Sequence, residues 1–178
     1  MYSLDIVGSQ NAHNLVTVST DGRLCTWNLD MLSEPQDTVE LQGPNQKTVA
    51  ATCISFPQGD FNSFAAGSEE GTIYGAVRHG AKSSQVTETF EGHSGPVTAI
   101  DFHKAGAGEY SHLFLSASTD WTVKLWSFRS KKPIYSFEDA SDYVYDVQWS
   151  TIHPSLFVSA DGNGELDFWN PNSDTEVW

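Results

Sequence analysis

Residues 90–126 read FEGHSGPVTAIDFHKAGAGEYSHLFLSASTDWTVKLW, and this segment decides the fold. It holds an apolar run from Val97 to Phe102, a second run from Leu113 to Ser118, a polar turn at Asp120, and a third run that ends at Trp126. Short apolar runs separated by polar turns predict antiparallel strands joined by hairpins. The segment therefore predicts three neighbouring strands of one sheet.

Polar and aromatic side chains of this segment are spaced to form a chain of hydrogen bonds. His93 precedes the first strand, from where it can donate a hydrogen bond to Asp120 in the turn. A hydroxyl of the second strand, from Ser116 or Ser118, can accept a hydrogen bond from the indole N–H of Trp126. Such a chain satisfies buried polar groups and holds the loop against the hairpin. We therefore predict a structural network.

Serine, histidine and aspartate are also the members of a nucleophilic triad. The sequence lacks the G-x-S-x-G turn that exposes a nucleophilic serine. The structural network explains His93, Asp120 and the strand serines without any chemistry. We therefore assign no catalytic residue, no cofactor and no small-molecule substrate, and we predict that the chain is not an enzyme.

The same hairpin pattern recurs along the chain. The equivalent segments are 14–28 (NLVTVSTDGRLCTWN), 63–77 (SFAAGSEEGTIYGAV), 112–127 (HLFLSASTDWTVKLWS) and 155–170 (SLFVSADGNGELDFWN). Their equivalent third-strand positions, which are 49, 50 and 43 residues apart, are Trp27, Ala76, Trp126 and Trp169. A period near about 40 to 45 residues is typical of the four-stranded blades of WD-repeat propellers. The sequence is therefore a repeat array.

The segment around His93 and Trp126 resembles the WD-repeat consensus, which implies an all-β fold: a WD-repeat β-propeller of about four blades. We expect blades at about 1–40, 46–90, 91–138 and 139–178, with first strands at 2–7, 49–56, 97–102 and 144–149. The clearest fourth strands are 86–90 and 133–137, and the last strand of the fourth blade is expected to begin within 174–178. Closed propellers have about four to eight blades, so four blades is the lower limit for closure. We therefore expect an open or partial propeller, in which the flanks of the first and fourth blades are exposed apolar surfaces.

The other repeats depart from this pattern. The second repeat has Glu70 at the turn and Ala76 in place of the tryptophan, so its network is expected to be absent or rebuilt. The fourth repeat has Asn163 at the turn, and the first repeat keeps Asp21 but has no Gly-His pair. We therefore expect one complete network, in the third blade.

Composition limits the partners. The 178 residues include 9 Lys and Arg against 23 Asp and Glu, a formal charge of −14, which disfavours nucleic acids and anionic membrane surfaces. The cysteines, Cys25 and Cys53, lie in apolar segments and are predicted to be core residues of a protein in a reducing compartment. The remaining histidines lack partners at metal-ligand spacing, so we expect surface or capping roles and no metal site for His13, His79, His103, His112 and His153.

Five stretches are similar, in order, to the propeller of cytoplasmic dynein intermediate chains. They are 11–37 (NAHNLVTVSTDGRLCTWNLDMLSEPQD), 67–80 (GSEEGTIYGAVRHG), 90–103 (FEGHSGPVTAIDFH), 111–126 (SHLFLSASTDWTVKLW) and 135–170 (YSFEDASDYVYDVQWSTIHPSLFVSADGNGELDFWN). The resemblance implies a non-catalytic subunit that binds dynein heavy chain in a microtubule motor, in the cytoplasm and on the cytoskeleton. Members of that family bind other dynein subunits through regions that are absent here, so we expect a partial chain.

Aromatic residues near the predicted rim are candidates for partner contacts. Trp121 follows Asp120 in the turn, while Tyr143 and Tyr145 stand at the entrance of the strand at 144–149. Aromatic side chains are enriched at interface hot spots. The alternative is that Trp121 packs on a neighbouring turn and one tyrosine belongs to the core.

Two other functions are compatible with a propeller. The first is a generic WD-repeat adaptor in another complex, such as a ubiquitin ligase or a chromatin assembly. The second is a propeller enzyme, which would need acid, base or metal-binding residues that converge on the central channel. The acidic residues are spread over the turns, so the sequence favours a binding module.

Overall fold

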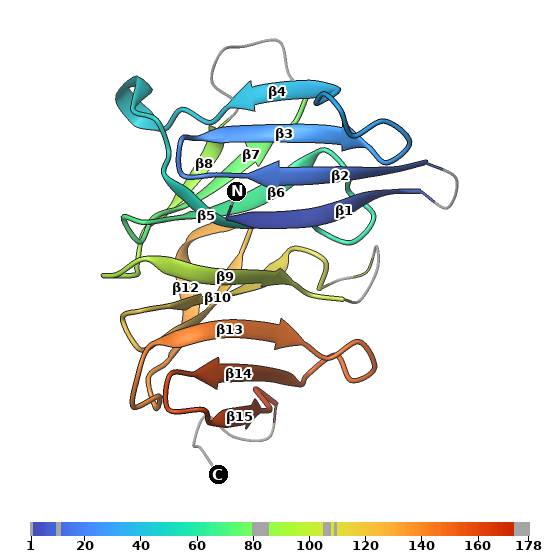
Figure 1. Ribbon diagram of the computed structural model, residues 1–178. Helices are drawn as coiled ribbons and strands as arrows, with labels where there is room; N and C mark the ends of the chain where they lie inside the picture. The colour runs from blue at the N-terminus through green and yellow to red at the C-terminus, as the bar shows by residue number, and fades with distance from the viewer. Residues whose placement is uncertain (1, 10–11, 80–85, 105–107, 109, 173–178) are drawn as a thin grey trace.

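The computed structural model describes residues 2–9, 12–79, 86–104, 108 and 110–172. In these residues the chain forms fifteen strands, arranged in four antiparallel sheets, and one short 3-10 helix. Figure 1 shows the sheets following one another in the order of the sequence. The prediction of an all-β repeat fold is confirmed. No helix in the described part of the chain is long and apolar enough to cross a membrane.

The first two sheets, called blades one and two, each have four strands in sequence order. Blade one consists of β1 (Ser3–Ser9), β2 (Ala12–Val18), β3 (Arg23–Asn28) and β4 (Asp37–Glu40). Blade two consists of β5 (Ala51–Ser55), β6 (Ser63–Ser68), β7 (Ile73–Val77) and β8 (Val86–Phe90). The insertion at 43–47 between them contains the 3-10 helix Pro44–Gln46.

The next two sheets are called blades three and four. Blade three consists of β9 (Val97–Phe102), β10 (Leu113–Ser118), β11 (Val123–Ser127) and β12 (Ser130–Phe137). Blade four consists of β13 (Val144–Trp149), β14 (Phe157–Asp161) and β15 (Leu166–Trp169). The strand expected to begin within 174–178 lies outside the described residues.

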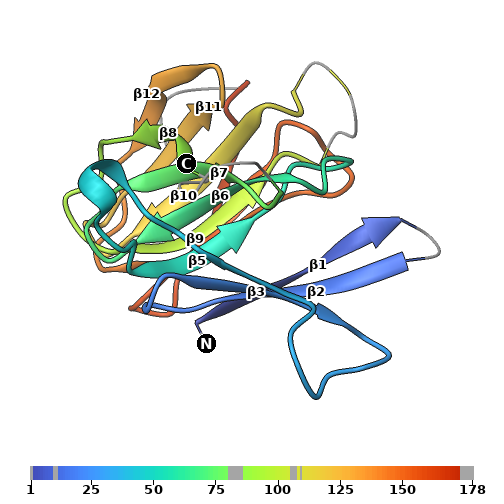
Figure 2. The ribbon, with the colours of Figure 1, turned by 90° about the horizontal axis from the view of Figure 1, so that it is seen from above.

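The blades form an open arc rather than a closed ring. Their first strands lie side by side in the order β1, β5, β9, β13, and blades one and four stand at opposite ends (Figure 1). The view from above shows blade one splayed away from the other sheets (Figure 2). The expected open arrangement is therefore found.

Three apolar clusters fill the spaces between successive blades. The middle cluster is the most aromatic: Trp126 of blade three is fully buried and lies against Phe90 of blade two, with ring centroids 6.0 Å apart. Phe114 stacks on Trp126 at 6.1 Å and also meets Phe90 edge to face at 5.4 Å. Burial of one large apolar side chain contributes about 1.5–3 kcal/mol. The core therefore lies between blades, so each blade depends on its neighbour.

The two end blades expose apolar flanks. On blade one, Leu4 and Ile6 point away from blade two and are 52% and 60% exposed. On blade four, Leu166 and Phe168 are 62% and 81% exposed. These side chains occupy the faces where a further blade would pack in a longer array.

Side-chain hydrogen bonds tie each first strand to the next blade. Thr52 Oγ1 of β5 donates to the carbonyl oxygen of Val97 at 2.5 Å, and Thr98 Oγ1 of β9 donates to that of Val144 at 2.6 Å. The two threonines occupy the same position in successive blades. The inner edge of the arc is therefore held by a repeated link.

His103 was predicted to have a surface or capping role, and the structure places it in the interior. Its side chain is almost fully buried, with Nε2 2.6 Å from the carbonyl oxygen of Pro154 in blade four. Its ring also packs against Trp149, with centroids 4.6 Å apart. Asp101 adds a parallel link, because its Oδ2 accepts a hydrogen bond from the Trp149 amide at 2.8 Å. The residues at the end of β9 thus fasten blade four to blade three.

Candidate functional site

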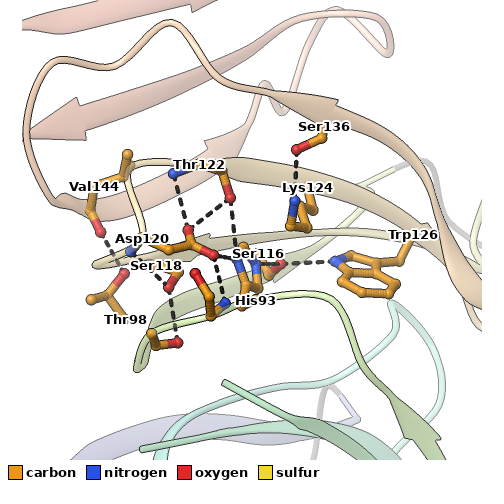
Figure 3. A network of polar contacts seen from close by, with 12 residues as sticks. His93, Thr98, Ser116, Ser118, Asp120, Thr122, Lys124, Trp126, Ser136 and Val144 are labelled. Carbon is orange, nitrogen blue, oxygen red and sulfur yellow. Dashed lines mark hydrogen bonds and ion pairs between the residues drawn. The ribbon is translucent and has the colours of Figure 1, made fainter. Parts of the chain in front are cut away.

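The hydrogen-bond network of blade three starts in the loop before β9 and ends in the core (Figure 3). His93 Nδ1 lies 2.9 Å from Asp120 Oδ2, and His93 Nε2 lies 2.6 Å from Ser116 Oγ. Trp126 Nε1 donates to the same Ser116 Oγ at 2.8 Å. Since a carboxylate can only accept and an indole N–H can only donate, His93 donates to Asp120 and the Ser116 hydroxyl donates to His93. The chain of donors and acceptors is thereby complete.

Asp120 is the most heavily bonded member of the network. Besides His93, its carboxylate accepts hydrogen bonds from the Ser94 amide at 2.9 Å and from Thr122 Oγ1 at 2.7 Å. Burial alone would raise the pKa of Asp120, but the hydrogen bonds that its carboxylate accepts from His93, Ser94 and Thr122 hold the pKa well below its usual range. The folded protein therefore favours the ionised carboxylate at this turn.

The two candidate serines have different roles. Ser116 links His93 to Trp126, whereas Ser118 Oγ donates to the carbonyl oxygen of Gly95 at 3.0 Å and accepts from the Asp120 amide at 3.1 Å. Thr122 is a further member of the network that was not predicted, although a threonine two residues after a turn aspartate is placed to bond its carboxylate. The structure joins four predicted residues in one chain of hydrogen bonds: His93, Ser116, Asp120 and Trp126. Ser118 makes a separate connection between the loop before β9 and the β10–β11 turn.

The arrangement has no access for a substrate. The Ser116 side chain is fully buried and the His93 side chain has no exposed surface. A nucleophile needs contact with the reacting atom of its substrate. The geometry supports a structural role, which is to hold the loop before β9 against the β10–β11 turn. Among the residues that the structure describes, no group of three histidines, cysteines or acids is placed to hold a metal ion.

Blades one and four keep only the inner half of this network. Trp27 Nε1 donates to Thr17 Oγ1 at 2.9 Å in blade one, and Trp169 Nε1 donates to Ser159 Oγ at 2.9 Å in blade four. Each hydroxyl lies ten residues before its tryptophan, as Ser116 lies ten residues before Trp126. The bond from indole to strand hydroxyl is thus the shared element of the repeats.

The link from loop to turn is rebuilt with other residues in blades two and four. In blade two, an exposed ion pair joins Lys47 to Glu70, at the positions that His93 and Asp120 occupy in blade three. In blade four, Asn163 Nδ2 donates to Ser141 Oγ at 2.9 Å. The same connection is therefore made near the surface in blades two and four and in the interior in blade three.

The three candidate aromatic residues at the rim are all exposed. Trp121 is 48% exposed and adopts a left-handed backbone conformation with φ of 70° in the β10–β11 turn. Tyr143 and Tyr145 are half exposed, and their rings meet edge to face with centroids 6.4 Å apart. Neither tyrosine belongs to the core, so the core alternative is wrong for both. Exposed aromatic rings on a fixed turn and a first strand can contact another macromolecule.

Comparisons with known proteins agree with this geometry. Residues 84–127 match the family described as WD domain, G-beta repeat. The chain is 54% identical over 178 residues, or 99% of its length, to the cytoplasmic dynein 1 intermediate chain of Drosophila melanogaster. The chain resembles the WD-repeat region of cytoplasmic dynein intermediate chains. It spans 27% of the length of that Drosophila intermediate chain, and the segment with the complete hydrogen-bond network is the one that matches the WD-repeat family.

Proposed function

We propose that this chain is a non-catalytic scaffold segment of the cytoplasmic dynein motor complex, where it binds dynein heavy chain and supports microtubule-based movement. The observation that carries the proposal is the 54% identity to a cytoplasmic dynein 1 intermediate chain over 99% of the chain. The proposed location follows from this role: the cytoplasm and the cytoskeleton, with dynein on microtubules. Other dynein subunits would bind regions of such proteins that this chain does not span.

The structure suggests how such a scaffold would act. The polar network of blade three is buried, so it fixes the backbone of the β10–β11 turn without facing a ligand. Trp121 stands on that turn, where its backbone amide donates to the carbonyl oxygen of Ser118 at 3.3 Å. Tyr143 and Tyr145 stand on the neighbouring blade. A rigid aromatic side chain loses little conformational entropy on binding, which favours its use as an interface anchor.

The test is affinity capture from cytosolic extract with the immobilised chain, followed by identification of the bound proteins by mass spectrometry. We expect dynein heavy chain to be recovered, and Trp121→Ala to reduce its recovery by roughly tenfold or more, the effect of losing one interface hot spot. Phe61→Ala is the matched control, because Phe61 is an equally exposed aromatic residue in the β5–β6 loop, at the other end of the strands.

One result would contradict the motor assignment, and another would contradict only the proposed interface. Recovery of a different complex, such as a ubiquitin ligase or a chromatin assembly, by a well-folded chain would favour the generic WD-repeat adaptor. Equal recovery of heavy chain with Trp121→Ala and Phe61→Ala would keep the motor assignment and remove the β10–β11 turn from the interface.

A further inference from the structure

A hollow of about 560 Å³ lies at the inner edge of the arc, and two tyrosines are among the residues that line it. Tyr2, before β1, and Tyr145, in β13, come from the two end blades, and both are more than half exposed. Thr52, Pro96 and Thr98 complete most of the lining. We call this hollow the tyrosine slot. Its residues come from all four blades, so only the assembled arc creates it.

The polar groups of the tyrosine slot differ in whether they are available to bind a ligand. Both threonine hydroxyls already donate to carbonyl oxygens of the next blade, so they have no proton to offer to a ligand. Glu69 is the one charged residue of the lining, and its side chain is exposed. None of the ion pairs found in the described part of the chain includes Glu69. The slot therefore combines aromatic walls with one negative charge that has no cationic partner.

A second carboxylate lies beside Tyr145. A methyl group placed on Gly162 would meet Asp142 Oδ2 at 2.5 Å and Tyr145 Cε2 at 3.2 Å, so both groups flank the same glycine. A cation next to this edge of the Tyr145 ring would thus be near the Asp142 carboxylate. The formal charge of −14 adds a favourable long-range field for any basic partner.

We propose that the tyrosine slot receives the side chain of a lysine or an arginine from a basic segment of a partner protein. Such a side chain has an aliphatic stem and a cationic head, which match the tyrosine rings and the Glu69 carboxylate. An acidic segment would be repelled by Glu69 and Asp142, and a purely apolar side chain would remove the carboxylate from water without replacing its hydrogen bonds. The inference rests on the proposed function in that it gives the chemistry of the partner expected at this face.

The direct test is a titration of the labelled chain with acetyl-arginine amide, followed by amide chemical shifts. Acetyl-citrulline amide is the matched control ligand, because it keeps the shape of arginine and has no charge. We expect arginine to shift the resonances of Tyr145 and Glu69 with a dissociation constant on the order of 1 mM, as is usual for a single-residue fragment. Citrulline is expected to bind at least about tenfold more weakly, since it cannot form a charge-assisted contact.

Variants of the chain test whether arginine binds at the tyrosine slot. Glu69→Gln and Tyr145→Ala should each weaken arginine binding by roughly five- to tenfold, as expected for the loss of one ionic or cation–π contact. Glu34→Gln makes the same change of net charge in the loop between β3 and β4 and should leave binding unchanged. Equal binding of citrulline and arginine, or no effect of Glu69→Gln, would overturn the proposal.

The arginine titration and the capture experiment test different claims, and either claim can fail while the other stands. If arginine binds in the slot and no heavy chain is captured, the slot is supported and the motor assignment fails. If heavy chain is captured equally by the unmodified chain and by Glu69→Gln, the motor assignment stands and the slot is excluded as its contact.

Discussion

Blades two and three share one hairpin design but stabilise it differently. Blade three has His93, Asp120 and Trp126 joined in a buried network, whereas blade two has Lys47 and Glu70 as an exposed ion pair and Ala76 at the tryptophan position. Both blades nevertheless form four regular strands. The comparison shows that the network is not required for a sheet to form.

Ala76 faces blade one, and on its opposite face blade two packs against blade three through small residues. A methyl group added at Gly67 would approach Val97 Cγ1 to 2.6 Å, and one added at Gly75 would approach Phe128 Cζ to 3.2 Å. Small residues of blade two thus make room for large residues of blade three. Packing complementarity is therefore a property of each pair of blades, and a consensus that describes single repeats does not capture it.

The largest expected effect is on the interface between the two blades. Trp126→Ala removes a fully buried ring together with its hydrogen bond to Ser116 and should lower the free energy of unfolding by about 3–5 kcal/mol. Urea unfolding monitored by circular dichroism measures the change. Trp27→Ala is the control, because Trp27 makes the same type of bond on the free flank of blade one and should cost less. Equal losses would mean that the interface adds nothing beyond the single blade.

The next effect compares the two loop-to-turn links. Asp120→Asn should destabilise the chain by about 1.5–3 kcal/mol, because it weakens charge-assisted hydrogen bonds in a nearly buried site. Glu70→Gln should cost less than about 1 kcal/mol, because both members of the blade-two pair are more than half exposed to water. Unfolding of both variants at pH 7 gives the comparison, and a larger loss for Glu70→Gln would contradict it.

The stability difference between the wild-type chain and Asp120→Asn should depend on pH. The pKa of Asp120 is lower in the folded chain than its unfolded value of about 3.9, so its contribution is fully present above that value. The contribution is lost as the pH falls through the unfolded value toward the folded one. Urea midpoints between pH 6 and pH 3 should therefore converge for the two proteins. A constant difference over this range would show that the carboxylate charge does not stabilise the turn.

The smallest effect is on chemical reactivity. Cys53 lies in the core between blades two and three, and burial raises the pKa of its thiol to about 12, whereas Cys25 of blade one is only partly buried. Iodoacetamide should modify Cys25 first, since the thiolate is the reactive form. Mass spectrometry over time gives both rates, and Trp126→Ala should accelerate the modification of Cys53 selectively. Equal rates for the two thiols in the wild-type chain would contradict the buried position of Cys53.

Much of the strand layout could be predicted from the sequence, because apolar runs and turns are local signals. The strands at 86–90, 97–102 and 144–149 are found at their predicted residues. The strand Asp37–Glu40 was not predicted, since only one of its four residues is apolar and it pairs along the outer edge of blade one. Weak alternation at a sheet edge leaves little pattern to detect.

Contacts between blades were harder to predict. His103 was expected to have a surface or capping role, yet it is buried against Pro154, which lies fifty-one residues further along the chain. Sequence spacing left Ser116 and Ser118 as equal candidates, and the pairing of β10 with β11 decides for Ser116. The tyrosine slot joins Tyr2 to Tyr145, residues from the two end blades. Only the stacking of repeats brings these groups together.

The repeated links along the first strands set the order in which the chain should open. Blade one is held to blade two through Ser3 Oγ, which accepts from the Ile54 amide at 3.3 Å, and through Arg78, which donates to Thr26 Oγ1 at 3.3 Å. Blade four is held to blade three by Thr98, Asp101 and His103. In a stack whose stability comes from neighbouring pairs, the blade that packs least on its neighbour detaches first, and β1 packs less closely on β5 than β13 does on β9. Amide hydrogens should therefore exchange fastest in β1 and slowest in β9 and β10, so the arc frays from blade one while its centre keeps its protons.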